Sequence, residues 1–244
     1  DARLQHPGRR SGRMIGLAFA LLLGGFLLLG ETHDNPLHHE VRAKLLGLDW
    51  RNASARPRGI VFEHIRADQQ AALDSAKPPN ATELMRALDW DTSGWPQDQM
   101  FAPLFEAALA SKRAILAGDP PRAQVRAIAK DGIAALDPAE AARLKLDQPL
   151  DAKLNDALLG ELAGSHCGLM PKTAFGTMAV AQRYRDAHLA VQLVKAADTT
   201  GSAVLLAGNG HVRSDRGVPH YLRQFAPGRT IVAVMLIAVE DGQT

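Results

Sequence analysis

Three short apolar runs in this chain are each followed at once by residues that can bind a metal or move a proton. The runs are residues 26–29, 60–62 and 203–207, and the polar residues that follow them are Glu31, His33, Glu63, His64 and His211. Short, almost uninterrupted apolar runs bounded by glycine predict buried strands of a parallel sheet. Because ligands of open α/β sheets bind beyond the carboxyl ends of the strands, these residues mark the expected site.

If the three strands are parallel neighbours, Glu31, His33, Glu63 and His211 converge on one rim of the sheet, although they are far apart in the sequence. Such a cluster can hold a divalent metal. It can equally act as a general acid/base cluster, because nearby carboxylates and imidazoles shift one another's pKa values. For the neighbouring His64 we expect instead an ordinary hydrogen-bonded or exposed histidine.

The rest of the hydrophobic pattern alternates between strand-length and helix-length segments. Further strands are predicted over residues 113–117 and 230–239, and helices over residues 36–46, 67–76, 100–111, 138–163 and 173–197. This order predicts an α/β fold with a mainly parallel central sheet flanked by helices, and a helical elaboration in the middle and second half of the chain. We expect one such domain over residues 14–244, preceded by a basic segment of residues 1–13.

The first predicted helix has two different faces. Leu37, Val41 and Leu45 form its apolar stripe, whereas His38 and Arg42 lie four residues apart on another face. The polar face begins within about one turn of the exit of the first strand. We therefore expect its side chains close to the site.

Three further features concern loops and caps. Asp119 comes after a predicted strand and before two prolines, which predicts a helix cap and a helix start. Residues 91–96 are rich in turn formers and predict a loop. In the helix predicted over residues 173–197, Gln182, Arg185 and Asp186 lie beside the apolar stripe, so they either have buried partners or form a solvated face.

Composition and charge restrict the class of protein. Apolar residues make up 46% and charged residues 22% of the chain, which is ordinary for a globular domain. The net charge is +2, but residues 1–13 alone contribute four arginines and one aspartate, which leaves about −1 for the rest. A nearly neutral body argues against a nucleic-acid-binding face.

Residues 14–29 are almost wholly apolar and follow the basic segment, as in a signal sequence or a membrane anchor. This stretch of 16 residues is shorter than a spanning helix, and Gly24 and Gly25 divide it. We therefore expect a short buried helix over residues 14–23 followed by the first strand, with only the basic segment left as a possible membrane tether. Any leader or lipid-attachment signal is expected ahead of Asp1.

Several kinds of chemistry lack their motifs. The chain has one cysteine, Cys167, which excludes an intrachain disulfide, a multi-cysteine zinc site and a C-x-x-C-H haem attachment. Neither H-E-x-x-H nor G-x-S-x-G occurs, and Cys167 beside His166 has no identifiable third partner. The sequence thus gives little support to a zincin or to a nucleophilic hydrolase. Gly208-x-Gly210 lacks the third glycine of a dinucleotide fingerprint and is interpreted as a tight turn that presents His211.

Taken together, the order and spacing of these motifs resemble a known family. The markers are residues 30–35 with His38 and His39, Phe62 and Glu63 with Gln69 and Gln70, residues 93–96, Ala102 with Pro103, residues 166–168, Gln182 with Arg185 and Asp186, and residues 208–219. Over residues 26–222 the chain resembles the ChaN-like haem-binding uptake proteins of the Tiki/TraB/erythromycin-esterase superfamily.

The resemblance implies an α/β protein of the bacterial cell envelope, typically a membrane-associated or periplasmic lipoprotein, that binds haem non-covalently for iron uptake. It also implies a homodimer with haem at its interface and contact with a haem-uptake machinery. The enzymatic branches of the superfamily are similar in placing two Glu and two His at Glu31, His33, Glu63 and His211. A metal-dependent or general-base hydrolase with a divalent metal is therefore the alternative.

The residues that we expect to contact haem come from several segments near the predicted site. They are His33, His38, His39, His166, Tyr184, Arg185, His211 and Arg213. Since imidazole and tyrosinate are both competent iron ligands, we expect the axial ligand among His33, His211 and Tyr184. The chain departs from the family pattern with Arg42 where Gln is frequent, Phe101 where Tyr is common and Asp119 where Asn is usual.

Overall fold

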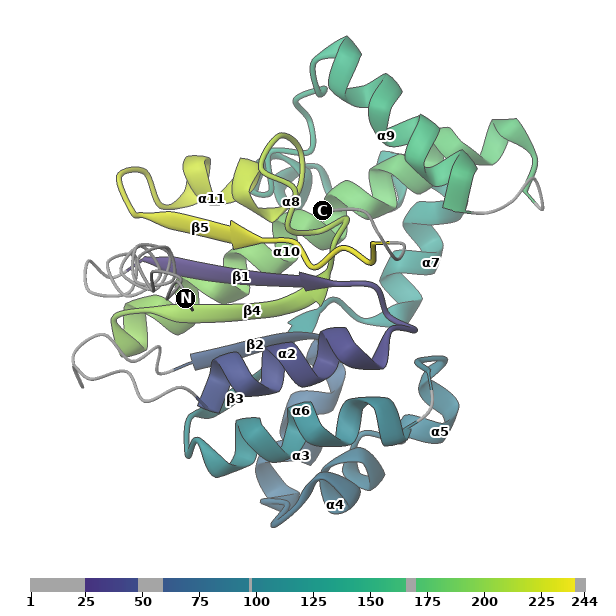
Figure 1. The fold of residues 1–244 in the computed structure, drawn as a ribbon. Coiled ribbons are helices and arrows are strands. Elements are labelled where there is room, and N and C mark those ends of the chain that lie inside the picture. Colours follow the sequence, from purple (N-terminus) through teal and green to yellow (C-terminus); the bar gives the residue numbers. More distant parts are fainter. Residues whose placement is uncertain (1–24, 48–58, 97, 166–169, 240–244) are drawn as a thin grey trace, which may run out of the picture.

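The computed structural model describes residues 25–47, 59–96, 98–165 and 170–239 and has three layers, with helices on both faces of one sheet (Figure 1). The strands are β1 (Phe26–Glu31), β2 (Gly59–Arg66), β3 (Ala114–Asp119), β4 (Ala203–Gly208) and β5 (Ile231–Val234). Their order is β3-β2-β4-β1-β5, and every pair is parallel. The predicted α/β class with a parallel sheet is confirmed.

The two faces of the sheet carry different sets of helices. One face is covered by α2 (Pro36–Gly47), α3 (Gln70–Ala76), α4 (Ala81–Ala87), α5 (Trp90–Ser93) and α6 (Asp98–Ala110), with a 3-10 turn at Ala67–Gln69. The other is covered by α7 (Arg122–Asp131), α8 (Pro138–Arg143), α10 (Phe175–Thr200) and α11 (Val218–Phe225). Helix α9 (Ala152–Ser165) packs on α10 at the carboxyl end of the sheet. Two further 3-10 turns lie at Gly132–Ala135 and Lys172–Ala174.

Strand β1 shows why the apolar runs are uninterrupted. Phe26 and Leu28 pack with α10 and α11, whereas Leu27 and Leu29 pack on the opposite side with α2, α4 and α6. Because side chains alternate along a strand and both faces are covered, every position of the run must be apolar. The same burial on both faces applies to β4, whose residues are all buried.

The predicted apolar stripe of α2 is wrong for two of its three residues, since only Leu45 packs against the core. Leu37 is 64% and Val41 38% exposed, whereas His38, His39 and Arg42 are buried. The helix begins at the carboxyl edge of the sheet, where the loop after β1 offers backbone hydrogen-bonding groups that polar side chains can satisfy. Hydrogen bonding to that loop therefore decides which face is buried, and the apolar pattern misleads here.

Four smaller predictions also need correction. The helix predicted over residues 138–163 is in fact two helices, α8 and α9, separated by residues 144–151. Part of the predicted loop over residues 91–96 is helical as α5, and its Trp90 is buried in the core beside α6. Asp119 does not cap α7, because its carboxylate pairs with Arg185 across the sheet edge. Strand β5 ends at Val234, earlier than predicted, and the following carbonyl of Leu236 accepts a hydrogen bond from the Asn209 side chain instead of extending the ladder.

Within the part of the chain that the structure describes, no helix is long and apolar enough to cross a membrane. The predicted helix over residues 14–23 and the basic segment of residues 1–13 lie outside the described residues. Their burial or tethering stays a prediction, while the strand expected after them is present as β1.

Candidate functional site

A cleft of about 460 Å³ opens where the carboxyl ends of β1, β2 and β4 meet the helices α9 and α10. Its lining includes the four residues predicted to converge, Glu31, His33, Glu63 and His211. Further side chains come from α10 (Gln182, Arg185, Asp186) and from α9 (Leu158, Glu161, Leu162, Ser165). The topology brings together residues as distant in sequence as Glu31 and His211, because β1 and β4 are neighbours in the sheet.

Glu63 lies within β2, where the register with β3 shifts between Phe62 and Arg66. Such an irregularity re-aims side chains at the end of a strand. One carboxylate oxygen of Glu63, Oε2, accepts the backbone N–H of Gly208 at 2.6 Å. The other, Oε1, lies 2.8 Å from Nη2 of Arg185 and 3.1 Å from Nε2 of His211. Both oxygens of this buried carboxylate are therefore engaged.

His211 lies between two carboxylates. Its Nδ1 is 2.6 Å from Oδ1 of Asp186, and its Nε2 faces Glu63. Burial alone would lower the pKa of His211, but the charges of Glu63 and Asp186 outweigh it and raise the pKa to about 10. Burial raises the pKa of Asp186 to about 6, although His211 opposes the shift. We conclude that His211 is an imidazolium that uses both ring nitrogens within the protein.

Arg185 joins this network to the next strand. Its Nη2 contacts Glu63 at 2.8 Å, and its Nε donates to Oδ1 of Asp119 at 2.7 Å. Desolvation would raise the pKa of Glu63, but the charges of His211 and Arg185 hold it well below its usual range. Burial raises the pKa of Asp119. The polar side chains of α10 were predicted either to have buried partners or to form a solvated face, and in the structure Arg185 and Asp186 have buried partners.

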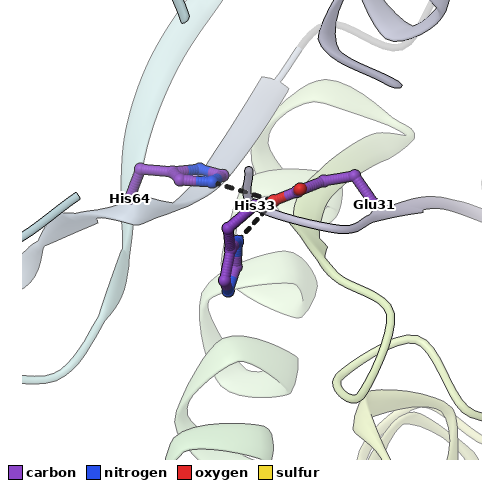
Figure 2. Close-up of side chains that lie close together, drawn as sticks. All are labelled: Glu31, His33 and His64. Carbon is purple, nitrogen blue, oxygen red and sulfur yellow. Dashed lines mark hydrogen bonds and ion pairs between the residues drawn. The ribbon is translucent and has the colours of Figure 1, made fainter. Parts of the chain in front are cut away.

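On the other side of the cleft, the Glu31 carboxylate contacts two histidines (Figure 2). Its Oε1 lies 2.6 Å from Nδ1 of His33 and 3.4 Å from Nε2 of His64. Nη2 of the buried Arg42 is 3.7 Å from the same oxygen. Burial would raise the pKa of Glu31, but these hydrogen bonds and charges bring it well below its usual range.

The two histidines beside Glu31 differ in exposure. The side chain of His33 is 41% exposed, whereas that of His64 is fully buried. Trp95 packs against both rings, with centroids 4.9 Å from His33 and 4.7 Å from His64. Burial lowers the pKa of His64 to about 4, which makes it neutral at physiological pH. Burial would lower the pKa of His33 too, but Glu31 and Glu63 raise it.

Several buried polar atoms on this side have no hydrogen-bond partner among the described residues. They are Oε2 of Glu31, Nδ1 of His64, and Nε and Nη1 of Arg42. One ligand atom from each of Glu31, His33 and His64 lies within 4.8 Å of the others, close enough to share a metal ion. Buried polar atoms without partners are rare and mark capacity for water, an ion or a ligand.

The loop that carries His33 is held from behind by α2. Nδ1 of His38 accepts the N–H of Thr32 at 3.0 Å, and Nε2 of His39 lies 3.0 Å from the carbonyl oxygen of His33. Nη2 of Arg42 contacts Nδ1 of His39 at 2.7 Å. His38 and His39 thus lie behind the cleft and contact its wall through the backbone.

The remaining predicted residues are placed as follows. Tyr184 lies in the apolar core beside His188, away from the cleft lining. Arg213 is at the surface and pairs with Asp215, whereas Arg216 lines the cleft and pairs with Glu161. His166 falls outside the described residues.

His64, predicted to be an ordinary hydrogen-bonded or exposed histidine, is fully buried and lies 3.4 Å from Oε1 of Glu31. The signal that could have found it is strand alternation. Successive residues of β2 face opposite sides, so Glu63 points to α10 and His64 points to Trp95 and Phe101. Both Glu63 and His64 therefore lie at the carboxyl edge of the sheet, on opposite faces.

One family profile and one solved structure agree with this fold. The profile of a family described as haem-binding uptake, Tiki superfamily, ChaN matches residues 20–222. A solved structure described as cofacial heme binding to ChaN of Campylobacter jejuni is 24% identical, with 93% of this chain and 86% of that chain covered and a TM-score of 0.72. The type III effector HopBA1 is 14% identical, with 83% and 74% covered and a TM-score of 0.43. No curated protein matches the chain.

Proposed function

The chain belongs to the ChaN family of haem-binding uptake proteins in the Tiki superfamily, and on this premise we propose that it binds haem reversibly in haem or iron uptake in the bacterial cell envelope. We place the haem iron at the mouth of the cleft, on Nε2 of His33. One observation carries this placement: His33 is half-exposed, and its other ring nitrogen, Nδ1, is fixed by Glu31 at 2.6 Å.

Iron-binding histidines commonly donate one ring N–H to a carboxylate or a carbonyl, which fixes the ring and leaves the second nitrogen for the metal. The contact between His33 and Glu31 has this form. The other two expected ligands are less suited, because His211 uses both nitrogens inside the protein and Tyr184 lies in the core. His33 is thus the best supported of the three.

The surroundings of His33 are compatible with a porphyrin that enters from the mouth. Leu158 and Leu162 of α9 line one wall, and Trp95 packs against His33. The charges deeper in the cleft are paired with one another, so they do not have to be neutralised by the ligand. Haem would supply an iron with an axial position for imidazole, and the protein would orient that imidazole.

A haemin titration of the full chain tests the placement. We expect a saturable Soret shift for the native protein and for His220→Ala, a histidine of α11 that does not line the cleft. His33→Ala should lose the imidazole signature and bind haemin about ten- to a hundredfold more weakly. Equal affinity of His33→Ala and native protein would reject His33 as the ligand, and no saturable shift in the native protein would reject haem binding.

A divalent-metal hydrolase is the second candidate. The observation that favours it is that one ligand atom from each of Glu31, His33 and His64 lies within 4.8 Å of the others. This set differs from the four residues predicted from the sequence, because Glu63 and His211 already have partners on every ligand atom. The permanently charged Arg42, 3.7 Å from Glu31, raises the electrostatic cost of a divalent cation there. We therefore rank haem first.

Calorimetric titration with Zn²⁺ or Co²⁺ separates the two candidates. A metal site on this side of the cleft should be abolished by His64→Ala and left intact by His211→Gln. Metal binding with that dependence, together with cleavage of an ester or peptide, would replace the haem proposal by the hydrolase.

A homodimer is a further part of the proposal. It follows from the resemblance described above, and the exposed apolar side chains of Leu37 and Val41 on α2 support it. Sedimentation velocity with and without haemin measures it, and a monomer under both conditions would reject it.

A further inference from the structure

We infer that Arg42 is a positioning residue that fixes the tautomer of His39 and, through it, the peptide of His33. The inference rests on the proposed function, because it treats His33 as the residue that holds the haem iron. Arg42 is fully buried on α2 and does not line the cleft, so it acts through its neighbours.

The first step concerns the contact between Arg42 and His39. A guanidinium has only N–H donors and no acceptor. Its Nη2 lies 2.7 Å from Nδ1 of His39, so this ring nitrogen must be the acceptor and carry no proton. Arg42 thereby selects one of the two neutral tautomers of His39.

The second step leads from His39 to the loop. With Nδ1 unprotonated, the proton of the neutral imidazole is on Nε2, which donates to the carbonyl oxygen of His33 at 3.0 Å. The opposite tautomer would place two acceptors face to face at this distance. In the same loop, Nδ1 of His38 accepts the N–H of Thr32 at 3.0 Å. Two successive residues of the loop are therefore held by two successive histidines of one helix.

The third step concerns the ring of His33. Its Nδ1 is held by Oε1 of Glu31, and Nη2 of Arg42 is 3.7 Å from that same oxygen. The Arg42 guanidinium thus acts on the peptide of His33 through His39, while Glu31 holds the ring of His33. A Cβ on Gly208 would lie 2.8 Å from Cε1 of His33, so the ring has little room on that side. Backbone and ring are both restrained before a ligand arrives.

Two substitutions separate hydrogen-bond donation from charge. Arg42→Gln keeps an N–H donor for His39 but removes the positive charge, and Arg42→Met removes both. Donation through His39 predicts a normal site in Arg42→Gln and a loosened one in Arg42→Met. Arg183→Met is the matched control, since Arg183 is also buried but bonds Tyr221 and backbone carbonyls outside the cleft.

The first measurement needs no haem. Nitrogen-15 NMR of the ligand-free protein should show His39 protonated on Nε2 in native protein, Arg42→Gln and Arg183→Met, and a mixture of tautomers in Arg42→Met. An unchanged tautomer in Arg42→Met overturns the inference. Should Arg42→Met not fold, His39→Leu and His39→Gln test the hydrogen bond to the loop directly. Only the glutamine keeps a donor for the carbonyl of His33.

The second measurement uses haemin. We expect Arg42→Met and His39→Leu to bind it about ten- to a hundredfold more weakly, with an altered spin state of the bound iron, and Arg42→Gln and Arg183→Met to match native protein. Equal losses in Arg42→Gln and Arg42→Met would assign the effect to charge and overturn the inference. If native protein binds no haemin while the tautomers respond as expected, the proposed function fails and the control of the His33 loop by Arg42 stands.

Discussion

The two sides of the cleft are built from the same kinds of residue and differ in how many of their polar atoms are used. The closed half consists of Glu63, Arg185, Asp186 and His211, and the open half of Glu31, His33, Arg42 and His64. In the closed half, every oxygen of Glu63 and both ring nitrogens of His211 have partners. In the open half, Glu31 and His64 each have a buried atom without a partner among the described residues.

This difference shows that capacity for a ligand follows from unused hydrogen-bonding and coordination sites rather than from residue type. The closed half is a structural unit, because paired buried charges resist both exposure and substitution. In the open half, several buried polar atoms have no hydrogen-bond partner among the described residues, and one histidine is half-exposed. We therefore expect substitutions in the closed half to change stability, and those in the open half to change binding.

The largest effect is expected from Glu63→Gln. The substitution removes the charge between Arg185 and His211 while keeping the size of the side chain. Breaking one partner of a buried ion pair costs about 3 to 5 kcal/mol, so the free energy of unfolding in urea should fall by this amount. His33→Ala is the comparison from the open half and should change it by less than about 1 kcal/mol. Equal losses for both substitutions would contradict the division into two halves.

The pH dependence of stability provides a second test of the closed half. The pKa of His211 is about 10 in the folded protein, against 6.5 for an unperturbed histidine. Because the folded-state pKa is raised, the stabilisation is fully present below pH 6.5 and is lost as the pH rises through 10. We expect the free energy of unfolding to fall by a few kcal/mol over this window. In His211→Gln the same window should be nearly flat, and an equally steep fall in that variant would show that another group is responsible.

Much of the fold followed from the hydrophobic pattern. All five strands and the long helix α10 were predicted, because burial on both faces of the sheet requires continuous apolar runs. The errors lie where polar contacts decide the structure. On α2, the loop after β1 attracts His38 and His39 inward and leaves Leu37 exposed. Such a preference depends on a backbone segment that no local pattern reveals.

For the site, convergence of Glu31, His33, Glu63 and His211 could be predicted from their position after the strands. What could not be predicted from the sequence is which of these side chains have all their polar atoms paired within the protein and which do not. That Glu63 is saturated depends on the N–H of Gly208, and that His64 belongs to the site depends on its contact with Glu31. Both contacts require the order of the strands and their register, which arise only in the folded sheet.

The smallest expected effect concerns space in the open half and comes from Gly208→Ala. The added Cβ would lie 2.8 Å from Cε1 and 3.0 Å from Nε2 of His33, so the half-exposed ring has to swing away from Glu31. Since the half-exposed ring can turn toward solvent to relieve the clash, stability should change by less than about 1 kcal/mol, while haemin affinity falls by at most about tenfold. Gly210→Ala is the matched control, because its Cβ would meet Glu161 at 3.4 Å and Gln182 at 3.9 Å in the same cleft without reaching His33. If haemin titrations give both alanine variants the same affinity, the orientation of the His33 ring does not control binding, and the open half is then only an unfilled space beside the closed one.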